Sequence, residues 1–201
     1  MRKTIAAAFS AAFISSGVLH AEETSGLIFV MRHTDKAATP AEQAASPAGF
    51  DRDCNPKDGL SPAGVDRASA AAAELSTVLF AEAYSSDMCR TAHVAYIVSG
   101  DPAPEVVSDP NDDAAGFFAA MADRATAAGG KGGNILVVLH SNWIAPLFDG
   151  VHAEVTAPSW AAPQCYGDVR AFRVENGRWV YAASYQTAVS YIEYGECVDG
   201  G

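Results

Sequence analysis

Basic residues are scarce in this sequence. Its 201 residues include 13 Lys and Arg against 24 Asp and Glu, which gives a formal net charge of −11 at pH 7. An acidic surface repels nucleic acids and anionic membranes, so neither is expected as a partner. Any site that binds an anion must therefore bring several of these few cations together.

Closely spaced cysteines are also lacking. Cys54, Cys89, Cys165 and Cys197 lie far apart, and the absence of a Cys-x-x-Cys pair argues against a structural zinc site. In an oxidising compartment, four cysteines predict two disulfides with three possible pairings. We expect Cys89 to have a structural role.

Long apolar runs are confined to the N-terminus. Arg2 and Lys3 precede the apolar segment TIAAAFSAAFISSGVL, which ends in the small-residue site LHA. This pattern predicts a secretory signal peptide over residues 1–21, with a membrane anchor as the alternative. Cleavage after Ala21 would leave one domain, residues 22–201, without a membrane span, in the periplasm or the medium.

Apolar runs alternate with helical patterns along the rest of the chain. Four runs predict strands, at 26–31, 81–87, 105–109 and 134–141. Three patterns predict helices, at 62–79, 89–97 and 112–128. The segment VRAFRV-ENG-RWVYAAS predicts a hairpin. This order predicts an α/β fold, a three-layer sandwich with a mainly parallel central sheet flanked by helices.

Two details refine these elements. Ser61, followed by Pro62, predicts the N-cap and first turn of the first helix. The third helix is expected to carry Phe117, Met121 and Ala125 on one face.

The segment 37–59 is rich in Ala, Pro, Asp and Gly and is long for a loop, which predicts a lid or a binding loop.

Polar residues stand at the carboxyl ends of the predicted strands. Arg32-His33, Ser85-Ser86 and His140 all occupy such positions. Ligands of α/β sheets bind beyond the carboxyl ends of the strands. We therefore expect these side chains to meet in one crevice.

Two arginines and two histidines in one crevice suit phosphate chemistry. Arg32 and Arg90 can hold phosphate oxygens through paired hydrogen bonds, and the helix start near Arg90 adds a favourable dipole. The two cations are expected to lower the pKa of His33, which leaves a neutral imidazole free to act as a nucleophile. His140 can donate a hydrogen bond to the oxygens of the transferring group.

Four segments resemble motifs of the histidine phosphatase superfamily, the phosphoglycerate mutase-like enzymes. MRHTDK (31–36) is similar to the Arg-His-Gly signature, and GLSPAGVDRASAAAAEL (59–75) to the Leu-Ser/Thr-x-x-Gly helix start. YSSDMCRTAHVA (84–95) resembles the Ser-Ser-x-x-x-Arg-Thr stretch, and VVLHSNWI (137–144) resembles the second-histidine segment. The motifs follow the family's order, and the resemblance they carry extends over most of the mature chain, from about residue 26 to 150.

The resemblance implies a phosphohistidine intermediate on His33. It also implies a phosphate pocket made by Arg32, Arg90 and His140, with no metal ion and no organic cofactor. The sequence departs from the family pattern at Thr34, where glycine is common.

The general acid is left open by the sequence. Ser141 follows the second histidine, where the phytase-like branch has Asp. The segment NDDAAG (111–116) is similar to the Asn-Glu-x-x-x-Gly element that holds the acid in the phosphoglycerate mutase branch. We predict Asp112 as the general acid, with Asp113 and Asp35 as alternatives, although a solvated turn would explain Asp112 equally well.

The sequence thus predicts an exported phosphatase that hydrolyses small phosphomonoesters. The cysteine of DRDCNPKDG (51–59) is similar to one in periplasmic lipopolysaccharide-type members, which makes a cell-envelope phosphate a candidate substrate. The alternatives are a non-catalytic module that binds a phosphorylated ligand and a mutase-type phosphotransferase. A serine hydrolase based on Ser141 is disfavoured because the Gly-x-Ser-x-Gly turn is missing. Nothing in the sequence indicates the oligomeric state.

Overall fold

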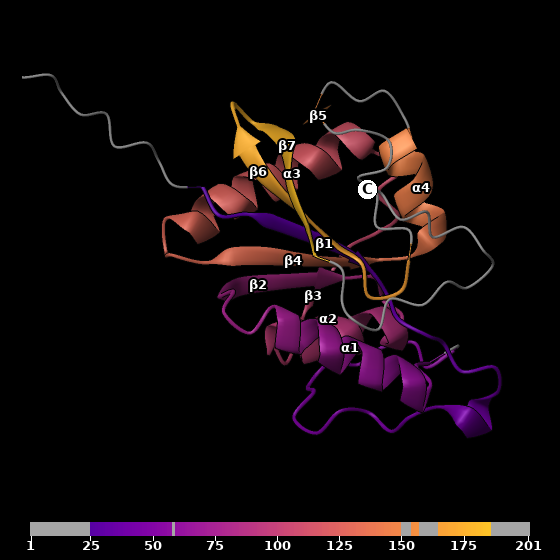
Figure 1. Cartoon of the computed structure of the whole chain (residues 1–201). Helices are drawn as coiled ribbons and strands as arrows, with labels where there is room; N and C mark the ends of the chain where they lie inside the picture. Colours follow the sequence, from indigo (N-terminus) through magenta and orange to yellow (C-terminus); the bar gives the residue numbers. More distant parts are fainter. Residues whose placement is uncertain (1–24, 58, 150–153, 157–164, 186–201) are drawn as a thin grey trace, which may run out of the picture.

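A computed structural model describes residues 25–57, 59–149, 154–156 and 165–185. It contains a seven-stranded sheet with the strand order β3-β2-β4-β1-β6-β7-β5 (Figure 1). The strands are β1 (Ile28–Arg32), β2 (Phe80–Ser85), β3 (Glu105–Val106), β4 (Asn134–Leu139), β5 (Val155–Thr156), β6 (Val169–Glu175) and β7 (Arg178–Tyr185). The helices are α1 (Pro62–Glu74), α2 (Cys89–Ser99), α3 (Ala114–Gly129) and α4 (Ser141–Asp149), with a short 3₁₀ helix at Pro40–Glu42.

Helices cover both faces of the sheet. In Figure 1, α1 and α2 lie on one side of the strands, and α3 and α4 lie on the other. The side chains of β1 alternate accordingly: Ile28 and Val30 pack in the cluster that contains α3 and α4, whereas Phe29 and Met31 pack in the cluster that contains α1 and α2. Cover on both faces explains why this strand is apolar without alternation. The predicted three-layer sandwich is confirmed.

The sheet is mainly parallel, as predicted. The four strands β3, β2, β4 and β1 are parallel neighbours, and β5 runs parallel to β7. The hairpin β6–β7 adds the two antiparallel pairings. Its turn contains Asn176 and Gly177, both with positive φ (53° and 74°), which is the geometry that suits a two-residue hairpin loop.

Several elements differ from their predicted extent. The strand β3 has only two residues, both exposed at the edge of the sheet. The helix α4 was not predicted, and it contains Pro146 in its interior. On α3 the fully buried aromatic residue is Phe118, whereas Phe117 is only partly buried against the same cluster. Ser61 caps α1 as predicted, since its hydroxyl accepts from the amide of Gly64 at 3.1 Å.

Some predictions lie outside the described residues. These are the signal peptide over 1–21 and Cys197. Within the described part of the chain, none of the helices combines the length and apolar character needed to cross a bilayer.

Candidate active site

The ends of β1 and β4 bring the two predicted histidines together. Arg32 pairs with Leu139 in the parallel ladder, and the amide of His33 donates to the Leu139 carbonyl at 3.0 Å. His33 and His140 are therefore the first residues beyond two neighbouring strands, and their ring centroids lie 5.2 Å apart. Each side chain is 5% exposed. The expectation that these strand ends converge is met by this geometry.

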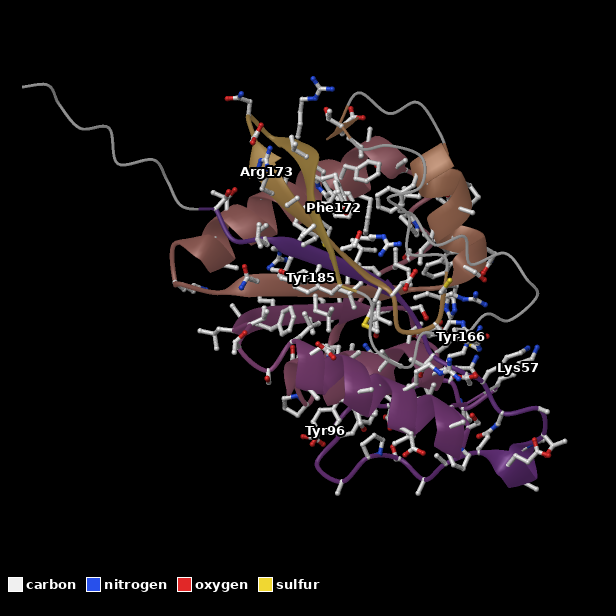
Figure 2. The ribbon with its side chains drawn as sticks, in the orientation of Figure 1. Lys57, Tyr96, Tyr166, Phe172, Arg173 and Tyr185 are labelled. Atoms are coloured by element: carbon white, nitrogen blue, oxygen red, sulfur yellow. A yellow bond between two sulfur atoms is a disulfide. The ribbon has the colours of Figure 1, made fainter. Side chains whose placement is uncertain are left out.

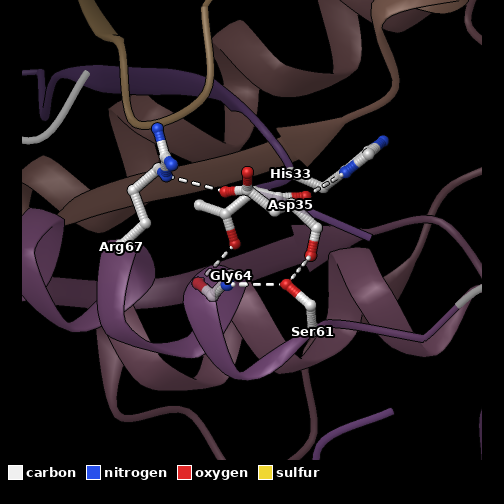
Figure 3. Close-up of polar contacts among 6 residues, drawn as sticks. His33, Asp35, Ser61, Gly64 and Arg67 are labelled. Atoms are coloured by element: carbon white, nitrogen blue, oxygen red, sulfur yellow. Dashed lines mark hydrogen bonds and ion pairs between the residues drawn. The ribbon is translucent and has the colours of Figure 1, made fainter. Parts of the chain in front are cut away.

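The chain after His33 is fixed against the N-terminus of α1 (Figure 3). The Thr34 hydroxyl donates to the Gly64 carbonyl at 2.7 Å, and the Asp35 carboxylate pairs with Arg67 at 2.7 Å. A Cβ on Gly64 would lie 2.2 Å from the Asp35 carbonyl oxygen, so only glycine permits this close approach. Thr34, where glycine was the more usual residue, thus contributes a buried hydrogen bond of its own.

The hydrogen bonding of His33 defines its tautomer. Its Nδ1 lies 2.7 Å from the Thr34 carbonyl oxygen, which can only accept, so Nδ1 carries the proton. Burial lowers the pKa of His33 to about 3, against the hydrogen bond to Thr34, and the neighbouring His140, Arg90 and Arg32 lower it further. The neutral ring therefore has its lone pair on Nε2. The sequence had attributed the low pKa to the arginines alone, whereas burial is the larger cause.

His140 is held from the side of β2. Its Nε2 lies 2.7 Å from the Ser86 hydroxyl, which in turn contacts the Thr91 hydroxyl at 2.7 Å and accepts from the Met88 amide at 3.2 Å. The Nδ1 atom of His140 is buried and has no partner within the described residues. Burial and Arg90 lower the pKa of His140 to about 4, while Asp87 and Asp109 oppose the shift. The second ring is therefore also neutral.

These residues line a pocket of about 270 Å³. Its walls are formed by Arg32, His33, Lys36, Arg90, His140, Ser141, Asn142 and Tyr166. The predicted phosphate pocket contains Arg32, His33 and His140, which come from the ends of β1 and β4. Its fourth predicted residue, Arg90, comes from the first turn of α2. The pocket can therefore surround a tetrahedral anion with two guanidinium groups and two neutral imidazoles.

Two residues that line the pocket, Tyr166 and Lys36, were not among the site residues predicted from the sequence. The Arg32 guanidinium carbon lies 4.1 Å from the centroid of the Tyr166 ring, and the His33 ring lies 5.7 Å from it. Tyr166 can thus hold Arg32 by a cation–π contact while it closes one side of the pocket. No motif marks this tyrosine, and the only available signal was its position in an irregular stretch before the hairpin.

The candidate general acids lie outside this pocket. Asp113 caps α3, where its carboxylate accepts from the Gly116 amide at 3.0 Å, and Asp35 is engaged by Arg67. Asp112 is exposed in the turn before α3. That turn is joined to α4 by the Asn111 side chain, which donates to the Trp143 carbonyl at 3.1 Å.

The loop 37–57 is attached to the start of α2 by a disulfide. Cys54 and Cys89 are bonded, and the backbone of Asn55 exchanges hydrogen bonds with Asp87 (2.8 Å) and Cys89 (2.9 Å). The structural role expected for Cys89 agrees with this bond, and Cys165 is disulfide-bonded as well. His93 lies beside Cys54 and Cys89, but the two sulfur atoms are bonded to each other and offer no thiolate to a metal ion.

Several solved structures share this fold, and one of them is a protein histidine phosphatase. The protein histidine phosphatase SixA, in complex with tungstate, aligns with a TM-score of 0.54 at 18% identity, over 80% of this chain and 96% of SixA. SixA from Nakamurella multipartitia gives 0.50 at 17% identity, over 82% and 97%. YhfR from Bacillus stearothermophilus gives 0.50 at 16%, over 79% and 96%. No family model and no curated protein matches the sequence.

The chain therefore has the fold of the histidine phosphatase superfamily, as the motifs implied. The alignments cover 80–82% of this chain and 96–97% of these solved structures, so the similarity extends well beyond the four motifs.

Proposed function

We propose that this protein is a phosphatase that hydrolyses phosphomonoesters through a covalent phosphohistidine on His33. The observation that carries the proposal is the tautomer of His33, whose Nδ1–H is committed to the Thr34 carbonyl while the neutral ring lines a cationic pocket. A free Nε2 lone pair beside bound phosphate is what nucleophilic attack on phosphorus needs.

In the first step Nε2 of His33 attacks the phosphorus atom, and the bond to the leaving oxygen breaks. Arg32, Arg90 and His140 hold the three equatorial oxygens, where the charge of the transition state accumulates. For His140 to donate there, its proton must sit on Nδ1, so the Ser86 hydroxyl must donate to Nε2. Ser86 then accepts from the Met88 amide, and the Thr91 hydroxyl, which otherwise donates to the Met88 carbonyl at 2.8 Å, must turn its single proton to Ser86.

The leaving alkoxide takes a proton from a carboxylic acid, for which Asp112 remains our candidate. In the second step a water molecule attacks the phosphohistidine, the N–P bond breaks, and the carboxylate accepts the proton from the water. His33 returns to its neutral state, and phosphate is released. The residues named need neither a metal ion nor an organic cofactor for this cycle.

We propose further that residues 22–201 form one exported domain in the periplasm or the medium. The Cys54–Cys89 disulfide supports an oxidising compartment. A small phosphorylated molecule of the cell envelope is the candidate substrate. The tungstate bound to SixA is a tetrahedral anion of the kind that the pocket of this chain would surround.

Trapping of the intermediate tests the proposal. Purified protein is mixed with ³²P-labelled p-nitrophenyl phosphate and quenched without acid, and the labelled protein is then exposed to acid or base. We expect a label that is stable in base and lost in acid. Variant His33→Gln should carry no label and should lose turnover by about 10³-fold or more. Excess EDTA should leave the turnover of the unmodified protein unchanged.

The matched control is His93→Gln, a buried histidine outside the pocket that contacts Ser46. This variant should keep both the label and the turnover. A base-labile label would indicate a carboxylate nucleophile and would overturn the role of His33. Tight phosphate binding without turnover or label would instead favour the non-catalytic binding module.

A further inference from the structure

A second cavity lies beside the candidate phosphate pocket. It has a volume of about 410 Å³ and is lined by residues 37–40, 43 and 55–57 of the long loop, half of which are alanine or proline. Thr39, Gln43, Asn55 and Lys57 supply its polar side chains. This cavity is larger than the phosphate pocket itself, which has about 270 Å³.

Two observations place the cavities next to each other. Lys36 lines the phosphate pocket, and the next residue, Ala37, lines the second cavity. On the other side, Arg90 lines the phosphate pocket and donates to the Lys57 carbonyl at 3.4 Å. Figure 2 shows Lys57 and Tyr166 at the same edge of the molecule, beyond the carboxyl ends of the strands. A group bonded to a phosphate in the pocket can therefore extend into the second cavity.

Several of the few cations of this acidic chain lie at the two cavities. Of its 13 basic residues, four line them: Arg32, Lys36, Lys57 and Arg90. Elsewhere, arginines such as Arg67 and Arg124 are paired with carboxylates. The ion pairs found within the described residues involve neither Lys36 nor Lys57.

This distribution leaves a cation beyond what one phosphate requires. Arg32, Arg90 and Lys36 already surround the pocket for the reacting phosphate, which carries at most two negative charges. Lys57 belongs to the adjoining cavity and is exposed, so water solvates its ammonium group when no anionic group lies there. An anionic group at that place would match Lys57, and the amides of Gln43 and Asn55 could bond its oxygens.

We propose that the second cavity binds the leaving group of the substrate, and that this leaving group carries an anionic group of its own, held by Lys57. The substrate class is then a phosphomonoester with a second phosphate or carboxylate. The inference rests on the proposed function, since it takes the first pocket as the place of the reacting phosphate.

The test compares alkanediol bisphosphates with the corresponding monophosphates, in chains of three to six carbons. Each bisphosphate has two equivalent ends, so a twofold advantage in kcat/KM is purely statistical. We expect the best chain length to exceed this factor by about fivefold, the scale of one exposed charge pair. The advantage should shrink in 0.5 M NaCl because salt screens exposed charges.

Two variants locate the effect. Lys57→Gln should reduce the bisphosphate advantage to the statistical factor. Lys131→Gln removes the same charge from an exposed lysine that precedes the amino end of β4, the end of the strand opposite to His140, and should keep the advantage. p-Nitrophenyl phosphate serves as the reference substrate, with its His33-dependent turnover.

The outcomes separate the two proposals. If p-nitrophenyl phosphate is hydrolysed through His33 but no chain length shows more than the statistical advantage, the anionic subsite is refuted and the phosphatase stands. Equal effects of Lys57→Gln and Lys131→Gln would refute it too, because the preference would then follow net charge alone. If the unmodified protein hydrolyses none of these phosphates, both proposals are overturned.

Discussion

The candidate site has two halves that are held in place by different means. In the strand-end half, Arg32, His33 and His140 follow two neighbouring strands of a buried sheet, and buried hydrogen bonds orient both rings. In the loop half, which comprises residues 36–57 and the turn 109–113, the side chains stand on irregular and largely exposed backbone. One disulfide and a few backbone hydrogen bonds attach the loop 37–57 to α2. We infer that the strand-end half carries the chemistry common to phosphomonoesters, whereas the loop half selects among them.

Among the variants that compare the two halves, the one with the largest expected effect tests whether the loop half also supplies a proton. With an alkyl phosphate, Asp112→Asn should lower kcat by about 100-fold, since the alkoxide then leaves without its acid. The loss should be much smaller with p-nitrophenyl phosphate, whose leaving group needs no proton. Steady-state kinetics on the two substrates measures this difference.

Asp113→Asn is the matched comparison for Asp112. Asparagine is as good an N-cap as aspartate, so α3 should keep its stability. If Asp113→Asn shows the selective loss and Asp112→Asn does not, the acid is Asp113. Equal losses on both substrates would show that neither carboxylate protonates the leaving group.

An intermediate effect is expected at Ser86, in the strand-end half. Ser86→Ala removes the hydroxyl that contacts Nε2 of His140, and kcat should fall about 10-fold through poor orientation of the ring. Ser86→Thr keeps a hydroxyl and should restore most of the rate. The acid limb of the pH profile of kcat should shift in Ser86→Ala. The shift would not be expected if Ser86 had a purely structural role. Equal rates in the alanine and threonine variants would contradict this assignment.

The last prediction concerns the pH dependence of stability instead of the rate. In the folded protein the pKa of His33 is lowered to about 3 and that of His140 to about 4, whereas both titrate near 6.5 when unfolded. The unfolded chain therefore binds more protons below pH 6.5, and the free energy of unfolding should decrease as the pH falls towards 4. Each histidine contributes a slope of at most about 1.4 kcal/mol per pH unit.

Denaturant unfolding between pH 7 and pH 4.5 measures that slope. The double variant His33→Gln/His140→Gln should show a weaker pH dependence than the unmodified protein, since its glutamines do not titrate. Identical slopes would mean that the two rings are protonated in the folded state. Carboxylates elsewhere titrate in both proteins, so the difference between the two pH slopes reports on the two histidines of the strand-end half.

The same contrast separates what the sequence predicted from what it did not. β1 was predictable because a strand covered on both faces must be apolar throughout. The residues that follow such a strand lie at the carboxyl ends of the strands, where ligands bind. Ser61 was predictable because a local hydrogen bond decides a helix cap. The glycine at 64 belonged to a familiar motif, and the structure adds its reason, the approach of the Asp35 carbonyl.

The rest depended on tertiary contacts that no local pattern encodes. Tyr166 gains its place only when Arg32 is brought beneath its ring, and Lys57 only when the loop folds back on α2. The helix α4 was missed because Pro146 interrupts a helical pattern. The large share of burial in the low pKa of His33 also depends on the assembled layers rather than on the neighbouring residues in the sequence.

The Cys54–Cys89 disulfide has a consequence for the integrity of the chain. It closes a covalent ring with a sequence separation of 35 residues, and this ring contains α1 and β2. A protease that cuts once inside the ring does not release a fragment, because the sulfur bridge still joins the two sides. Arg32 and His33, which precede the ring, would thus stay tethered to Arg90 and His140, which follow it, until a reductant opens the bridge.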